Sequence, residues 1–170
     1  MGAGKTCIGK RLARKLGMEF VDADAEIETA ADRTVSEIFA EFGEQAFRDG
    51  ERRVIARLLS ERPRVIATGG GAFMDDETRA NARQNGISVW LKADLDVLLQ
   101  RVSRRNNRPL LKGGDKRRKL EELIKQRYPT YAEADVTVDT GDEPPDSTVQ
   151  KVYDALAGLD AVTDRSAAAE

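Results

Sequence analysis

Histidine is absent from this sequence of 170 residues, and cysteine occurs once. Without histidine, the chain cannot build Ser-His or Cys-His nucleophile pairs, HExxH metal sites or a histidine general base. Any catalysis therefore falls to aspartate, glutamate, lysine and arginine. A single cysteine forms no internal disulfide and is typical of a reducing compartment, so we expect a cytoplasmic protein.

The sequence also lacks an excess of either charge and any apolar run long enough to span a membrane. Lysine and arginine number 28, and aspartate and glutamate 30, for a net charge of -2. We therefore expect neither a nucleic-acid nor a membrane partner, and the glycine-rich start does not resemble a signal peptide. The size predicts one soluble domain over residues 1–159, acting as a monomer, with a disordered tail over 160–170.

The most informative motif is Gly2-Ala3-Gly4-Lys5-Thr6, the second half of a phosphate-binding loop. Its glycines let successive backbone N–H groups point at phosphate oxygens, and the helix that follows adds its positive end. The lysine brings a point charge to the β- and γ-phosphates, and the threonine hydroxyl suits magnesium. The motif therefore predicts a nucleotide-binding protein.

The first half of this loop is not in the sequence. A complete loop begins with a glycine that would lie two positions before Met1, after a strand that would lie further upstream. We expect that the recorded start is an internal methionine and that the true chain begins upstream. Such a strand is central in its sheet, so without it the two neighbouring strands would each have an unpaired inner edge.

Short strands alternate with helices along the rest of the chain, which predicts an α/β fold with a parallel sheet covered on both faces. Ligands bind such sheets at the carboxyl ends of the strands. The predicted strands are residues 19–21, 64–67, 87–91 and 136–138, and the predicted helices are residues 5–16, 25–31, 34–62, 75–85, 94–105, 115–127 and 148–159.

Two acidic residues and a glycine run follow the first two of these strands. Asp22 and Asp24 alternate along a strand end, so one could meet magnesium and the other a substrate hydroxyl. Alternatively, both cap the next helix, because aspartate is favoured there. The run Gly69-Gly70-Gly71 favours a ligand that approaches the backbone closely, since three glycines in series weaken a packed structure.

Basic residues supply further candidates. Arg48 and Glu51 are helical neighbours, and their default interpretation is an exposed ion pair. The basic run from Arg101 to Lys119 could be a solvated helix face, a weak nucleic-acid patch or a lid, at about residues 106–119, whose arginines close over a nucleoside triphosphate. Because no aromatic side chains lie nearby for base stacking, single-strand nucleic-acid binding is disfavoured.

Six segments taken together resemble the shikimate kinase family, and the resemblance extends to about Leu159. It implies a three-layer P-loop kinase fold with sheet order 2-3-1-4-5, strand 1 being absent here, and ATP-dependent phosphorylation of the 3-hydroxyl of shikimate. The segments are Gly2–Thr6, Phe20–Asp24, the run Ile38-Phe39 with Phe42-Gly43-Glu44 and Phe47-Arg48, then Thr68–Ala72, Arg108–Leu111, and Arg127-Tyr128-Pro129 with Tyr131.

The resemblance also implies roles for individual residues. ATP would be held by Gly2, Ala3, Gly4, Lys5 and Thr6, and Mg²⁺ by Thr6 with Asp22 acting through water. Shikimate would be bound by Asp24, Arg48, Gly69, Gly70, Gly71 and Arg127, with Glu51 holding Arg48. Lys5, Asp24 and the lid residue Arg108 would be catalytic, while Arg101 and the segment near Pro144 would border the adenine.

Two alternatives stay open at this point. A kinase of another small hydroxy acid would keep the loop and the lid, but it would not need the glycine run together with two carboxylate-binding arginines. A nucleotide-binding module without turnover is the other, because the absent strand affects the core of the fold.

Overall fold

The computed structural model describes residues 2–103 and 115–167, with side chains up to Leu159. Two parallel two-stranded sheets form its centre. Strand β1 (Glu19–Asp22) pairs with β2 (Arg64–Ala67), and β3 (Val89–Lys92) pairs with β4 (Val136–Asp139). In the described ranges neither β2 nor β3 has a second strand partner, which confirms the expected pair of unpaired inner edges.

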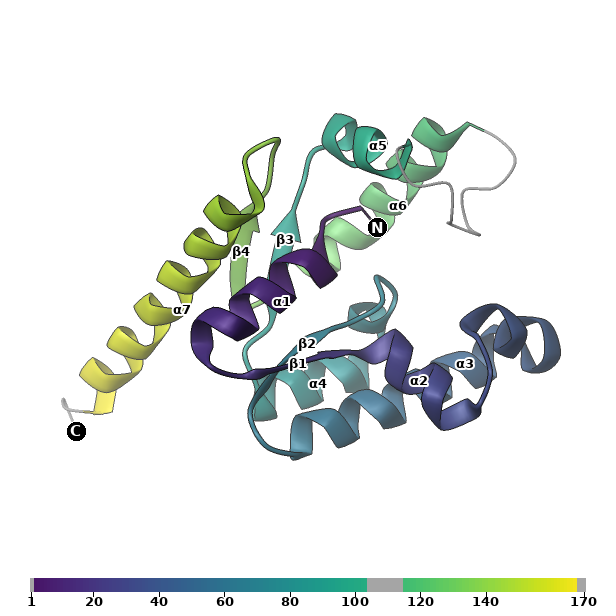
Figure 1. The fold of residues 1–170 in the computed structure, drawn as a ribbon, viewed down its shortest axis with the longest axis horizontal. Helices are drawn as coiled ribbons and strands as arrows, with labels where there is room; N and C mark the ends of the chain where they lie inside the picture. The colour runs from purple at the N-terminus through teal and green to yellow at the C-terminus, as the bar shows by residue number, and fades with distance from the viewer. Residues whose placement is uncertain (1, 104–114, 168–170) are drawn as a thin grey trace.

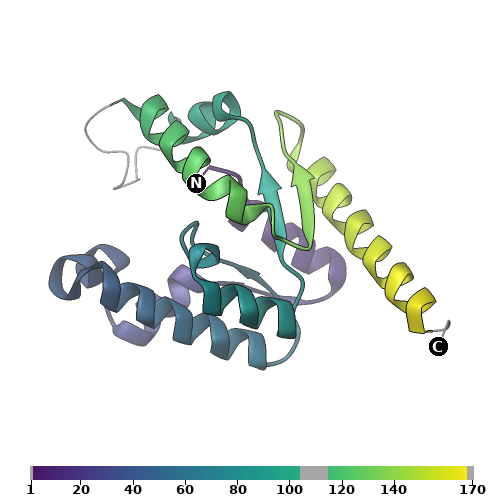
Figure 2. The ribbon, with the colours of Figure 1, turned by 180° about the vertical axis from the view of Figure 1, so that it is seen from behind.

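Helices cover both faces of these strands and produce three layers (Figures 1 and 2). Helices α1 and α7 lie on one face, and α3, α4 and α6 lie on the other, as Figure 2 shows from behind. The helices are α1 (Lys5–Leu16), α2 (Ala23–Ala31), α3 (Val35–Ser60), the 3-10 turn η1 (Ala72–Met74), α4 (Asp76–Asn85), α5 (Leu95–Ser103), α6 (Lys116–Tyr131) and α7 (Pro145–Ala167).

The alternation of side chains along each strand produces the two faces. On β2, Val65 packs toward the core of α1 and α7, whereas its neighbour Ile66 packs toward α3. On β3, Val89 contributes to the same core as Val65, whereas Trp90 packs edge-to-face against Tyr128 of α6 with ring centroids 4.8 Å apart. The strands are therefore apolar on both sides, as a sheet buried between two helical layers requires.

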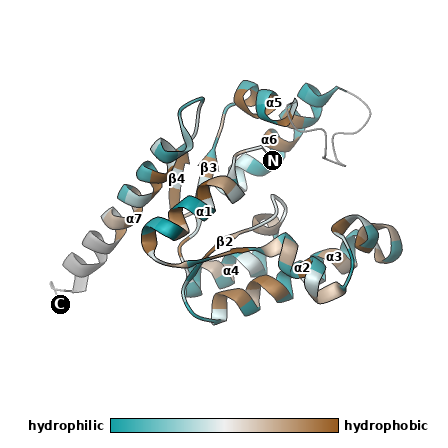
Figure 3. Ribbon diagram, in the orientation of Figure 1, coloured by the Kyte–Doolittle hydropathy of each residue, from teal (hydrophilic) through white to brown (hydrophobic). Residues whose placement is uncertain are grey.

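Helix α1 begins and ends as its sequence predicts. Gly4 caps it in the left-handed region at φ 90°, and Gly17 ends it at φ 67°. Ile8 and Leu12 are buried on its inner face, while hydrophilic positions face outward (Figure 3). These features position the phosphate-binding segment at the carboxyl ends of the strands.

Helix α3 carries Arg48 and Glu51, and it has a defined start and one break. Thr34 forms the predicted capping box with Glu37, whose side chain accepts from the Thr34 backbone N–H at 2.8 Å. Gly43 interrupts the helix at φ 80° and ψ 173°, a conformation reserved for glycine. The long second half of α3 then lies along β1 and β2.

Two predicted helix ends are wrong. Helix α6 continues past Arg127 to Tyr131, because Pro129 lies in the last turn, where a missing N–H removes only one helical bond. Helix α7 continues over residues 160–167 to Ala167 instead of ending at Leu159. This stretch contains neither glycine nor proline to stop the helix. No helix in the described ranges has the length and apolarity needed to cross a bilayer.

Candidate active site

The candidate site lies where the carboxyl ends of β1 and β2 meet the start of α1. Gly2 and Gly4 both have positive φ, at 77° and 90°, so the backbone turns as a phosphate-binding segment must. Lys5 is the first residue of α1, and its charge acts on Asp24, which lies just past the end of β1. The segment predicted from the sequence therefore opens a helix next to the two acidic residues.

Thr6 and Asp22 are in direct contact. The Thr6 hydroxyl donates to Asp22 Oδ2 at 3.1 Å, and the backbone N–H of Asp24 donates to Asp22 Oδ1 at 3.2 Å. Asp22 is therefore the N-cap of α2 as well as the partner of Thr6, so the capping alternative is correct for this residue. Asp24 lies in the first turn of α2 rather than on a strand, and the predicted alternation along one strand is wrong.

Asp24 and Glu51 converge on Gly69, from α2 and α3. A Cβ atom added to Gly69 would lie 3.0 Å from Asp24 Oδ1 and 2.9 Å from Glu51 Oε1. The close approach of two carboxylates explains why glycine occupies this position. Glu51 is buried, and among the described residues its Oε1 is the one buried side-chain oxygen or nitrogen without a hydrogen-bond partner.

Burial and nearby negative charge raise the pKa of both Asp24 and Glu51. Burial, reinforced by the charge of Asp22, raises the pKa of Asp24, whereas the positive charges of Lys5 and Arg48 oppose the rise. Burial also raises the pKa of Glu51, against the hydrogen bond from Arg48. Carboxyl groups that hold their protons more tightly than usual, side by side at the edge of a sheet, are typical of a catalytic site.

Arg48 is fixed by two acids and presses against the glycine run. Its guanidinium donates to Glu51 Oε2 at 2.7 Å and to Glu44 Oε1 at 3.1 Å. A Cβ atom on Gly71 would lie only 2.7 Å from Arg48 Cζ. The expected contact of Glu51 with Arg48 is therefore present, but the pair is partly buried and not the exposed ion pair that is the default for such spacing.

Arg127 reaches the same region from α6 through Tyr131. The positive charge of Arg127 acts on the phenol of Tyr131, whose hydroxyl donates to the carbonyl oxygen of Gly70. The charges of Arg127 and Arg48 both act on this phenol, although burial dominates and raises its pKa. The two arginines, 79 residues apart in the sequence, therefore both act on the phenol of Tyr131 beside the glycine run.

Arg101 connects the phosphate-binding segment to the loop after β4. Its guanidinium donates to the carbonyl oxygen of Ala3 at 3.4 Å, to Thr140 Oγ1 at 3.3 Å and to the carbonyl oxygen of Gly141. Helix α7 begins shortly afterwards, at Pro145. The residues expected near the adenine are therefore gathered beside the loop.

Arg108 and most of the predicted lid lie outside the described residues. Two other site residues have no role in the pattern of the sequence taken alone: Glu44, the second acid on Arg48, and Tyr131, the bridge to Gly70. Helical spacing could have identified both residues, because Glu44 is four residues before Arg48 and Tyr131 is four residues after Arg127.

Comparison with known proteins decides the family. A shikimate kinase family model matches residues 1–157. The chain belongs to the shikimate kinase family. The shikimate kinase of Caulobacter vibrioides is 59% identical over 156 residues, which are 92% of this chain and 78% of that protein. The shikimate kinase of Paramagnetospirillum magneticum is 56% identical over 156 residues, 92% of this chain and 80% of that protein.

Solved structures agree with this family and confirm the three-layer P-loop kinase fold. A shikimate kinase from Acinetobacter baumannii, in complex with shikimate, is 40% identical with a TM-score of 0.88, covering 94% of this chain and 89% of that one. A gluconokinase from Sinorhizobium meliloti matches with a TM-score of 0.60 at 20% identity, a likeness of fold alone.

Proposed function

We propose that this shikimate kinase family member transfers the γ-phosphoryl group of ATP to the 3-hydroxyl of shikimate, producing ADP and shikimate 3-phosphate. The observation that carries the proposal is the convergence of Asp24, Glu51 and Arg48 on the glycine run, beside Lys5. An acidic group for an alcohol and a guanidinium for a carboxylate thus lie next to a phosphate-binding segment.

The phosphate end of the site is built for positioning and charge neutralisation, which is most of what phosphoryl transfer requires. The backbone of Gly2 to Gly4 and the N-terminus of α1 would hold the triphosphate, and Lys5 would reach its terminal phosphates. Arg101, bonded to the loop backbone and to the segment after β4, would border the adenine.

The acceptor end orients the alcohol. Asp24 would accept a hydrogen bond from the 3-hydroxyl and take its proton as the oxygen attacks the γ-phosphorus, while the bond from that phosphorus to the β,γ-bridging oxygen breaks. Arg48, held by two acids, and Arg127, whose charge acts on Tyr131, would bind the carboxylate of shikimate. A guanidinium suits this task because its fork matches two oxygens at once.

Thr6 and Asp22 would hold Mg²⁺ together with the phosphates. Their hydroxyl and carboxylate oxygens are 3.1 Å apart, and such hard oxygen donors fit magnesium. The described residues contain no cluster of three or more metal-ligating side chains, which suits an ion that is bound through one or two protein groups, water and substrate phosphates. When bound, the ion neutralises charge on the phosphates.

An acceptor panel tests the function. ADP formation is measured with shikimate, with gluconate and without an acceptor. Of these three conditions, we expect turnover only with shikimate, because two arginines and the close-packed glycine run suit its rigid ring and carboxylate. In Asp24→Asn, shikimate-dependent turnover should fall at least about 100-fold while ATP affinity persists. Equal turnover with gluconate, or full activity of Asp24→Asn, would contradict the proposal.

A further inference from the structure

The last turn of α6 brings two phenol hydroxyls to main-chain carbonyls. Tyr128 and Tyr131 are three residues apart, so they lie on the same face of the helix. The Tyr128 hydroxyl donates at 2.5 Å to the carbonyl oxygen of Ala93, just past the end of β3. The Tyr131 hydroxyl donates to the carbonyl oxygen of Gly70, past the end of β2. Helix α6 therefore contacts the chain after both strands through two similar hydrogen bonds.

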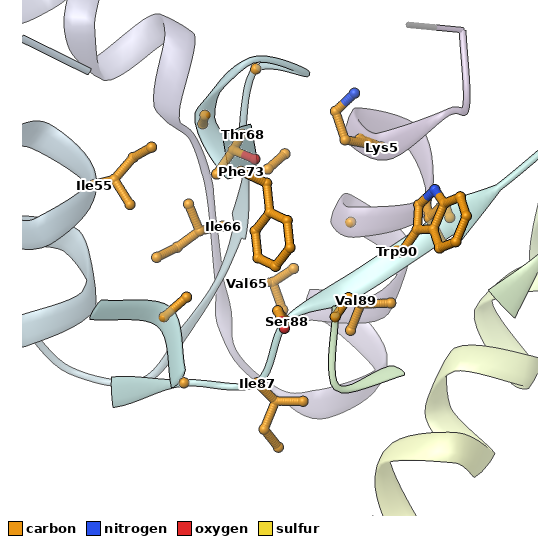
Figure 4. Close-up of a pocket in the computed structure, with 18 of the residues that line it drawn as sticks. Lys5, Ile55, Val65, Ile66, Thr68, Phe73, Ile87, Ser88, Val89 and Trp90 are labelled. Atoms are coloured by element: carbon orange, nitrogen blue, oxygen red, sulfur yellow. The ribbon is translucent and has the colours of Figure 1, made fainter. Parts of the chain in front are cut away.

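Neighbouring rings hold the side chain of Tyr131 in place. Figure 4 shows Phe73, which follows the glycine run, next to β2, and Trp90 on β3. The ring of Tyr131 packs edge-to-face against both, with centroids 6.4 Å and 5.9 Å apart, and it lies 6.2 Å from the ring of Tyr128. Because this aromatic packing fixes the ring, the hydroxyl is not needed to place the side chain.

The hydroxyl instead completes the hydrogen bonding of the glycine run. The carbonyl oxygens of the first and third glycines accept from backbone N–H groups of η1, at 3.3 Å and 3.0 Å. The carbonyl oxygen of the middle glycine, Gly70, accepts from Tyr131, which is 61 residues away in the sequence. Each carbonyl of the run therefore has a donor from the protein, and one of the three donors is a side chain.

The N–H groups of Gly70 and Gly71 are left as donors. Within residues 2–103 and 115–167, neither N–H donates to a backbone or side-chain acceptor. In a trans peptide the N–H points opposite to the carbonyl of the preceding residue, and no described peptide bond is cis. Because the Gly70 carbonyl is turned toward Tyr131, the Gly71 N–H is turned away from α6. The hydroxyl of Tyr131 thus sets the direction of a free donor in the segment that packs against Arg48.

We propose that Tyr131 is a positioning residue for the acceptor: its bond to Gly70 holds the next peptide so that the Gly71 N–H donates to an oxygen of the bound hydroxy acid. This role rests on the proposed function. Glycine peptides rotate more freely than any others, so a run of three needs an anchor from outside the run. A donor that is already oriented binds an oxygen without a further ordering cost. Tyr131 acts through the peptide and does not touch the ligand.

Tyr131→Phe tests this role, because it removes the hydroxyl and keeps the ring. Tyr128→Phe is the matched control, since it removes the neighbouring hydroxyl, which bonds to Ala93 and not to the glycine run. Calorimetry on the full chain measures the Kd of shikimate and of ATP. In Tyr131→Phe we expect the Kd of shikimate to rise about tenfold, the loss typical of one hydrogen bond to a charged group. In Tyr128→Phe, and for ATP in both variants, we expect unchanged Kd values.

Steady-state kinetics separates positioning from a general loosening of the fold. The glycine run would hold the acceptor equally before and during phosphoryl transfer. The KM for shikimate should therefore rise about tenfold in Tyr131→Phe, whereas kcat should change by less than about threefold. An equal loss of shikimate affinity in the two variants, or an equal loss for ATP and shikimate in Tyr131→Phe, would overturn the proposal.

Two measurements on the unchanged protein complete the test. In NMR spectra, shikimate should shift the amide resonance of Gly71, and no shift would overturn the proposal whether or not Tyr131→Phe folds. ADP formation with shikimate tests the proposed function separately. If the unchanged protein turns over shikimate and the two variants bind it equally, only the role of Tyr131 fails. If the unchanged protein does not turn over shikimate, the proposed function fails and the role of Tyr131 fails with it.

Discussion

At the scale of single residues, the site depends on a few charges held where water is scarce. Asp24 and Glu51 share the space beside Gly69, and burial raises the pKa of both. Arg48 offsets this by donating to Glu51 at 2.7 Å. The arrangement keeps a carboxylate ready to receive a proton without surrounding it with solvent.

The pH dependence of turnover follows from these charges. In the proposed reaction, Asp24 must be ionised to accept the proton of the alcohol, so kcat/KM should fall as the pH drops through its raised pKa. The negative charge of Glu28 contributes to that rise, so Glu28→Gln should move the acidic limb to lower pH. The Val35 N–H donates to Glu28 Oε1 at 2.9 Å, and the glutamine keeps an oxygen that can accept this hydrogen bond. Unchanged or upward-shifted limbs in pH–rate profiles would contradict this electrostatic role.

Stability gives an independent readout of Asp24. A carboxyl whose pKa is raised by folding binds its proton more tightly in the folded state, so its ionised form disfavours folding at pH values above that pKa. Asp24→Asn should therefore have a Tm at pH 7 no lower than that of the unchanged protein, although it loses activity. The difference in Tm between the two proteins should vanish at pH values below the ordinary aspartate pKa, where the carboxyl group is protonated in both the folded and the unfolded state. Thermal unfolding at both pH values measures it, and a lower Tm at pH 7 would show that the carboxylate stabilises the fold.

At the scale of elements, α3 carries Arg48 and Glu51, and Gly43 determines its course. Gly43 has φ 80° and ψ 173°, with no atom within 4 Å of an added Cβ. Gly43→Ala should destabilise by about 1–3 kcal/mol through backbone strain alone. Gly50→Ala is the matched control on the same helix, since Gly50 has ordinary helical geometry and equally open space. In denaturant unfolding, Gly50→Ala should raise the unfolding free energy by about 1 kcal/mol. Equal effects of the two substitutions would show that the backbone at Gly43 is not strained.

The start of α3 yields a second prediction at this scale. Thr34 accepts from the Glu37 N–H at 3.2 Å, and the Glu37 carboxylate bonds back to the Thr34 backbone. Thr34→Ala should cost about 1 kcal/mol of unfolding free energy, whereas Thr34→Ser should cost little because it keeps the hydroxyl. Urea unfolding of both variants measures these losses of unfolding free energy. Equal losses in the two variants would mean that the hydroxyl does not cap the helix.

At the scale of the whole molecule, the sequence predicts most of the layers because periodicity and turn residues are local signals. The first helix, the four strands and the capping box are confirmed. The predicted end of α6 and the predicted place of Asp24 on a strand are wrong, because both depend on how the chain continues past a proline or a strand end. Contacts such as Tyr131 with Gly70, 61 residues apart, arise only when α6 folds over β3 and the glycine run.

The cluster of Arg48 and Arg127 is likewise a product of the whole fold. The motif resemblance names both residues, but no local pattern shows that α3 and α6 bring their charges to one phenol beside Gly70. This convergence is the basis of the proposal that both arginines bind the acceptor, in place of two separate surface arginines.

The most direct test of the account is a calorimetric comparison of shikimate with its methyl ester, which lacks the negative charge. If Arg48 and Arg127 bind the carboxylate, the ester should bind at least about 100-fold more weakly, because it loses charge-assisted hydrogen bonds. In Arg127→Lys, shikimate itself should bind more weakly and the difference between the two ligands should shrink. Equal affinity for acid and ester in the unchanged protein would contradict the proposed acceptor site.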